Sequence, residues 1–304
     1  MSIVFSIRNK KSLFGYQKVL SAKEVLAFTD GMTTYSYDAT HLNRSLNEFQ
    51  ALSCIVFGVS GLPLGLRYFD EEESYQIKVS SFATEDDWQL ALQWSSWLAE
   101  AMGSEILVSD GRSFDSVTIF DFDYQVITLK TFRQLVYEKD LKQFVVQGFA
   151  HPVYLDRDQV LGFLEHSQPL KTYAQFIKRI QYSTAHFSQV RFYQQKETGI
   201  FLACYSLTEE TDTMLPRHPH VPTEYVEAVG LSGEIQWEVQ LVSIDGDSSK
   251  PESYQSIASV TLKDFLVALR TEEFEQLDAN QIVIKKLSKE RLNELARLGQ
   301  NELV

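Results

Sequence analysis

The chain has 304 residues, of which 44% are hydrophobic and 23% are charged, and its mean hydropathy is −0.18. Together with only 14 glycines and 7 prolines, this composition excludes disordered and fibrous proteins and predicts one large core or, more readily, two. The formal net charge of −13, without a basic stripe, argues against a nucleic-acid-binding protein.

Membrane and secretion signals are not expected in this sequence. No segment approaches the roughly 18 apolar residues of a membrane span, and Arg8, Lys10 and Lys11 interrupt the first apolar run too early for a signal peptide. Cys54 and Cys204 lie in apolar runs without a nearby Cys or His at metal spacing, which indicates buried free thiols. We therefore expect a cytoplasmic protein with no membrane contact, no metal and no cofactor.

In chain order, the first part of the sequence alternates strand and helix patterns. The apolar alternation predicts strands, and N-capping residues and glycine stops predict helices. The expected strands are residues 2–8, 54–58, 66–69, 75–79, 105–108 and 117–122; the expected helices are 21–28, 38–49, 84–103 and a segment around 132–136.

The second part continues in the same way. Helices are expected at 156–164, 171–182 and 288–298, strands at 190–193, 200–207 and 234–244. The order of elements resembles half of a split βαβ unit, so the predicted fold class is α+β, with two lobes of helices packed on largely antiparallel sheets. Gly148 and Pro152 break the chain, and we place the boundary between an N-terminal domain, 1–148, and an acidic C-terminal domain, 149–304; one intertwined domain is the alternative.

The helix at 84–103 carries three of the four tryptophans and more apolar surface than one contact requires. On a helical wheel Trp88, Leu92, Leu98 and Met102 form the stripe that faces a sheet. A second stripe beside it is a candidate interaction surface, and it consists of Leu90, Trp94, Trp97 and Ala101. Leaving two tryptophans in water would forfeit roughly 1.5–3 kcal/mol each. We expect the second half of the chain to cover this stripe; a second subunit or a partner protein is the alternative.

Few residues suggest chemistry. Asp121 and Asp123 would share one side of the expected strand at 117–122, as an acid-base pair needs. His218 and His220 alternate along a proline-rich segment and could share one metal, although rigid polyproline structure explains the prolines more simply. The glycine-rich segment at 58–65 lacks the Lys-Ser/Thr ending of a phosphate loop, so a structural turn is the better interpretation.

The segment from Ala83 to Trp88, together with Gly103-Ser104-Glu105-Ile106, Asp110-Gly111 and the segments at 6–10 and 215–216, resembles an uncharacterised bacterial family of about this length, a domain of unknown function. The chain is more loosely similar to bacterial toxin-immunity proteins. This resemblance implies a bacterial α+β protein and carries no catalytic residues over to this sequence.

Three functions remain open. The first is a cytoplasmic, non-enzymatic interaction protein, in one form immunity-like, that binds a partner through the Trp94/Trp97 stripe or the acidic stretch at 201–281, which holds 15 acidic and 4 basic residues. The second is an unrecognised hydrolase with a site between the two halves that uses Asp121, Asp123, His218 or His220. The third is a scaffold whose activity is self-association.

Overall fold

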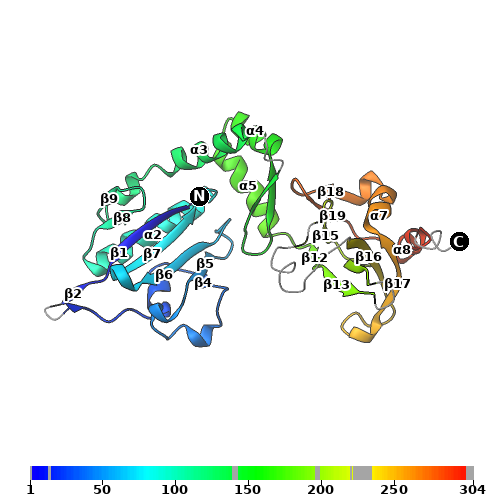
Figure 1. Cartoon of the computed structure of the whole chain (residues 1–304), viewed down its shortest axis with the longest axis horizontal. Helices are drawn as coiled ribbons and strands as arrows, with labels where there is room; N and C mark the ends of the chain where they lie inside the picture. The colour runs from blue at the N-terminus through cyan, green and yellow to red at the C-terminus, as the bar shows by residue number, and fades with distance from the viewer. Residues whose placement is uncertain are drawn as a thin grey trace. The chain divides into compact units, whose positions relative to one another are not determined.

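The computed structural model describes residues 2–12, 15–138, 143–195, 199–219, 221 and 235–298. The chain divides into two compact units, Met1–Tyr182 and Ser183–Val304, here called unit 1 and unit 2 (Figure 1). Each unit contains helices and largely antiparallel sheets, so the fold class is α+β. The boundary lies at Tyr182 rather than at residue 148, because the helices that follow residue 148 pack on unit 1.

Unit 1 is built on an antiparallel sheet of seven strands. Their order across the sheet is β4-β5-β6-β7-β1-β8-β9. The strands are β1 (Ser2–Arg8), β4 (Met32–Thr34), β5 (Leu52–Val56), β6 (Leu64–Phe69), β7 (Ser74–Ser80), β8 (Ile106–Val108) and β9 (Ser113–Phe114), with a separate hairpin of β2 (Lys11–Ser12) and β3 (Gly15–Tyr16). Strand alternation gives the sheet one face of buried apolar side chains and one polar face.

Helix α2 (Glu85–Met102) packs on the apolar face of this sheet, against β1, β7 and β8. The capping box between Thr84 and Asp87 begins the helix, and Gly103 ends it at a φ of 60°. Trp88 and Leu98 have no exposed surface, and Leu92 and Met102 are also buried. The predicted helix and its sheet-facing stripe are therefore confirmed.

The remaining elements of unit 1 lie around this layer. Helix α1 (Ala22–Leu26), which has the expected capping box at Ser21, belongs to the same core as α2. Helices α3 (Tyr124–Tyr137), α4 (Arg157–Glu165) and α5 (Pro169–Gln181) pack in succession, and α5 also contacts α2 (Figure 1). Strands β10 (Gln143–Val146) and β11 (Val153–Asp156) form a hairpin beside them.

In its described residues, unit 2 has two sheets of four strands each, ordered β12-β15-β19-β18 and β13-β14-β16-β17. The strands are β12 (His186–Phe187), β13 (Arg191–Gln194), β14 (Phe201–Thr208), β15 (Thr213–Pro216), β16 (Ile235–Ile244), β17 (Tyr254–Thr261), β18 (Phe274–Gln276) and β19 (Gln281–Ile284). Helices α7 (Leu262–Ala268) and α8 (Lys289–Ala296) pack with both sheets in one hydrophobic core. The sheets contribute Leu215 and Leu241 to this core, and the helices contribute Phe265 and Leu292.

Two expected elements of unit 1 are wrong. The segment at 38–49 forms two short 3-10 turns, Ala39–His41 and Leu46–Glu48, because Asp38 and Ser45 each start a new turn. The expected strand at 117–122 is instead the 3-10 turn Thr118–Asp121, whose start Asp115 stabilises by accepting hydrogen bonds from the backbone of Val117 and Thr118. Local side-chain contacts divided the expected helix into two turns, and they prevailed over apolar alternation in the expected strand.

Candidate functional site

The second stripe of α2 is covered from within unit 1. Trp94 has no exposed surface, and its indole Nε1 donates a hydrogen bond of 2.9 Å to the backbone oxygen of Val25 in α1. Leu90 and Ala101 are half-buried and pack against the same core, while Trp97 is half-buried. The cover of Trp94 is therefore the N-terminal segment around α1, not the second half of the chain. Trp94 stabilises the core and is closed to a partner.

The residues of the hydrolase hypothesis do not form a site within either unit. Asp121 and Asp123 flank the buried Phe122 at the end of a 3-10 turn, and Asp123 caps α3 by accepting a hydrogen bond from the backbone of Val126. His218 belongs to unit 2, and His220 lies outside the described residues.

The surroundings of His218 are polar, and the carboxylates of Glu238 and Asp264 line the same hollow. Its backbone N–H and C=O both bond to the side chain of Asn280, at 2.8 and 3.1 Å, so a buried amide holds the main chain here in place. The residue lines a hollow of about 890 Å³ with Trp237 and Lys263. Among the residues that the structure describes, no carboxylate hydrogen-bonds to the His218 ring, as a general base would need.

The glycine-rich segment at 58–65 is occupied by a carboxylate of the protein itself. Asp87, which has no exposed surface, accepts hydrogen bonds of 2.9 Å from the backbone N–H groups of Gly61 and Leu62, and others from Thr84. A Cβ atom at Gly61 would lie 2.4 Å from Thr84 Cγ2, so the loop is also closely packed. The amides that could hold a phosphate are therefore used to fix the loop to the start of α2.

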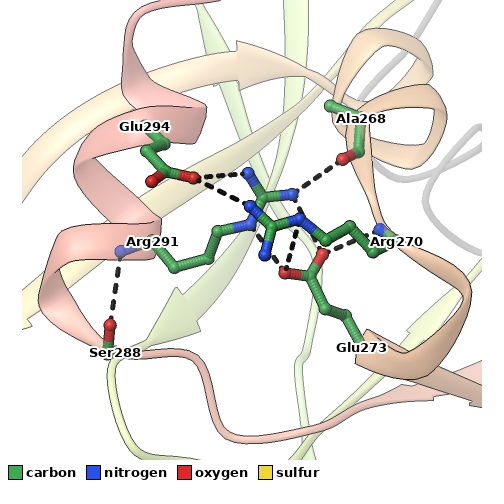
Figure 2. A network of polar contacts seen from close by, with 6 residues as sticks. All are labelled: Ala268, Arg270, Glu273, Ser288, Arg291 and Glu294. Atoms are coloured by element: carbon green, nitrogen blue, oxygen red, sulfur yellow. Dashed lines mark hydrogen bonds and ion pairs between the residues drawn. The ribbon is translucent and has the colours of Figure 1, made fainter.

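A charged cluster in unit 2 is the most extensive ion-pair network of the described residues. Arg291 on α8 binds both carboxylate oxygens of Glu273, at 2.6 and 3.0 Å, and also contacts Glu294 and the backbone oxygen of Ala268. Arg270 adds contacts to both glutamates, and Figure 2 shows the two guanidinium groups between the two carboxylates.

The electrostatics of this cluster indicate a structural role. Burial would raise the pKa of the Glu273 carboxyl, but hydrogen bonds from Arg291 and from the backbone of Arg270 outweigh it and lower that pKa. Two arginines and two glutamates balance one another, so no charge in the cluster is left for a ligand. Its effect is to hold α8 against the turn that follows α7.

The polar face of the unit 1 sheet, opposite the apolar side of α2, offers a better candidate. The register places the following side chains on it, and we call this surface the open face: Ser2, Val4, Ser6, Arg8, Ser53, Gly65, Arg67, Phe69, Ser74, Gln76, Lys78, Ser80 and Leu107. Arg8, Arg67, Lys78 and Leu107 are exposed. All three charged residues of the open face are basic, although the whole chain carries a net charge of −13.

Lys78 stands at the centre of the open face, where the register pairs it with Val4 on one side and Gly65 on the other. Two hollows of about 480 and 390 Å³ meet there, and Ser2, Gly65 and Lys78 line both of them. Within the described ranges, no acidic group forms an ion pair with Lys78. A free ammonium group surrounded by small and hydroxyl-bearing side chains is suited to bind a carboxylate or another anion.

Arg67 is held in a fixed position next to Lys78. Its Nε donates a hydrogen bond of 2.8 Å to the side chain of Gln76, and its guanidinium lies 5.1 Å from the centre of the Phe69 ring. These contacts use one of the five N–H groups of the guanidinium and leave the others available. Of the two central basic residues of the open face, Arg67 is therefore held in position, and Lys78 has no ion-pair partner among the described residues.

Sequence reasoning missed this face, although its signal is visible afterwards. Polar residues alternate with apolar ones in β7, where Gln76 and Lys78 separate Tyr75, Ile77 and Val79, and the strand was predicted on this basis. The strand order and register were not predictable from the alternation. Without them, Arg67 and Lys78 could not be placed side by side.

One comparison with known proteins identifies the family of this chain. The model of the family described as Domain of unknown function (DUF4299) matches residues 2–295. The chain belongs to this family. The match covers most of both units, and the description of the family names no activity. Searches of curated proteins and of solved structures found no match, and they lend no support to the looser similarity to toxin-immunity proteins.

Two further features are absent from the described part of the chain. No group of three or more His, Cys, Asp or Glu side chains there could hold a metal ion. Among the same residues, no helix has both the length and the apolar character needed to cross a membrane.

Proposed function

We propose that this protein is a non-enzymatic interaction protein that binds another protein across the open face of unit 1. The observation that carries the proposal is Lys78: it is exposed, has no ion-pair partner among the described residues and lies where two hollows meet. The charged side chains that line the two hollows, Lys78 and Arg67, are both basic although the whole chain is acidic, which supports an acidic partner.

The open face takes over the role that the Trp94/Trp97 stripe had in the sequence analysis. A binding surface must be accessible before the partner arrives, and Trp94 is not. By contrast, Leu107 on β8 keeps 42% of its surface exposed on the open face, diagonal to Arg8 on β1. The two buried free thiols, Cys54 and Cys204, support a reducing compartment, and we propose that the interaction occurs in the cytoplasm.

Site-specific photo-crosslinking in the source cells tests the proposal. A photoreactive phenylalanine analogue replaces Leu107 on the open face, and in a matched control it replaces Val126 on α3, which is 57% exposed. We expect a discrete crosslinked protein with the analogue at position 107 but not at position 126, and its loss when Lys78→Glu is added. Equal crosslinking at both positions, or none at position 107, would contradict the proposal.

A further inference from the structure

Lys78 and Arg67, the two central basic residues of the open face, have strand positions with a defined spacing. Lys78 pairs with Gly65 across the β6–β7 ladder, and Arg67 is two residues beyond Gly65 on the same side of β6. Such diagonal neighbours on one face of an antiparallel pair are about 7–8 Å apart. In an extended chain, side chains at every second position point the same way and are about 7 Å apart. The strand positions of Lys78 and Arg67 therefore match the side-chain spacing of an extended segment in which every second residue is acidic, and the long lysine and arginine side chains reach the acidic groups from these positions.

Gly65 leaves room for such a segment. A Cβ atom at this position would lie 3.2 Å from Lys78 Cβ, so a larger residue would press on the lysine stem. Ser53 and Lys78 flank Gly65 in the register, and Ser2 and Ser80 pair in the adjoining row. These short side chains keep the surface low around the ammonium group, and their hydroxyls can bond to the backbone or carboxylates of a bound chain.

We propose that the open face binds an extended acidic segment of a partner protein, with acidic residues at every second position that pair with Lys78 and Arg67. The inference rests on the proposed function of the open face and names the kind of partner that fits it. Arg8 lies beyond Arg67, two strands and one row away, and extends the basic surface in the same direction.

A nucleic acid is the less suitable anion for this surface. Proteins that bind single-stranded nucleic acid combine cations with exposed aromatic rings on which the bases stack. Among the open-face residues named above, the aromatic side chain is Phe69 on β6, which is half-buried and already carries the Arg67 guanidinium over its ring, so it is not free to stack on a base. Carboxylates spaced along a peptide need only the cations and hydroxyls that the open face provides.

Fluorescence anisotropy with two labelled peptides tests the spacing directly, using the full-length protein at low ionic strength. Both peptides contain the same number of glutamates and serines. In one peptide the glutamates stand at every second position of a central segment, and the remaining serines flank that segment. In the other the glutamates stand at every fourth position, the spacing that an acidic helix would present. We expect the first peptide to bind about fivefold more tightly, as one additional exposed ion pair would produce.

Variants assign the binding to the open face. Lys78→Glu should weaken binding of the first peptide by more than about tenfold, because an attraction becomes a repulsion. Lys130→Glu, on exposed α3 surface and with the same change in net charge, should change it less than about twofold. Lys78→Gln, which keeps the length of the side chain without its charge, serves if Lys78→Glu fails to fold, and its expected loss is about fivefold.

Three results would overturn the inference. The first is that the two peptides bind equally tightly, and the second is that Lys78→Glu and Lys130→Glu weaken binding equally. The third is that a single-stranded oligonucleotide binds more tightly than either peptide and that its binding depends on Lys78. If the peptides fail while the crosslink at position 107 persists and depends on Lys78, the face is an interaction surface and only the acidic spacing is wrong. If the crosslink also fails, the proposed function is wrong as well.

Discussion

Asp87 shows how one residue can exclude a function that its surroundings suggest. Its carboxylate serves two purposes, since it closes the capping box with Thr84 and accepts the backbone N–H groups of Gly61 and Leu62. Burial raises the pKa of Asp87 to about 6, although the hydrogen bonds from Thr84, Leu62 and Gly61 oppose the rise. A carboxyl group that titrates below neutral pH therefore joins the start of α2 to the loop that contains Gly61 and Leu62.

The raised pKa predicts a pH dependence of stability. Because the folded-state pKa, about 6, lies above the ordinary aspartate value of 3.8, the stability that Asp87 contributes is complete below about pH 4 and is lost as the pH rises through 6. Between pH 5 and 7 the free energy of unfolding of the native protein should fall by about 1 kcal/mol relative to Asp87→Asn, which does not titrate. Urea unfolding followed by tryptophan fluorescence at several pH values measures the difference. A constant difference, or one that grows with pH, would show that the carboxyl is not shifted upward.

At the scale of elements, α8 depends on charge as well as on apolar contact. Leu292 and Leu295 bury its apolar side, and Arg291 joins it to Glu273 with two hydrogen bonds (Figure 2). The side chains of Arg291 and Glu273 are only 16% and 10% exposed, so each needs the other to offset the loss of hydration. The sequence pattern predicted the apolar side of α8 but not this pair.

Removing one partner of this pair should be costly. We expect Arg291→Met to lower the free energy of unfolding of unit 2 by about 2–4 kcal/mol, because it leaves the Glu273 carboxylate partly buried with weaker contacts. Arg44→Met is the matched control, since Arg44 pairs with Glu48 on the surface, where both side chains are about half exposed, and should cost less than about 1 kcal/mol. Chemical unfolding of both variants, read from circular dichroism, makes the comparison. Similar losses would mean that burial does not set the strength of the Arg291–Glu273 pair.

At the scale of the whole molecule, the described residues form a large hydrophobic core in each unit. The core of unit 1 includes Trp88 and Trp94, and that of unit 2 includes Leu241 and Phe265. With 304 residues, two cores bury apolar surface more efficiently than one. Each core draws its residues from one unit only, which indicates that each unit is a folding unit of its own.

Calorimetry should therefore resolve two unfolding transitions in the intact chain. Trp94→Ala should lower the midpoint of one transition, because it removes a fully buried side chain worth about 3–5 kcal/mol. Arg291→Met should lower the midpoint of the other transition and leave the first in place. A single transition that both substitutions shift would show that the two units unfold together.

The sequence by itself determined the α+β class, most helices and strands, and the two faces of α2, because capping residues and apolar periodicity act over a few neighbouring residues. Only the tertiary structure decided what covers Trp94, since α1 lies far from it in the sequence, and which loop receives the Asp87 carboxylate. The candidate site also required the structure. Lys78 and Arg67 become neighbours through the antiparallel register of β6 and β7, which long-range pairing sets and local alternation does not encode.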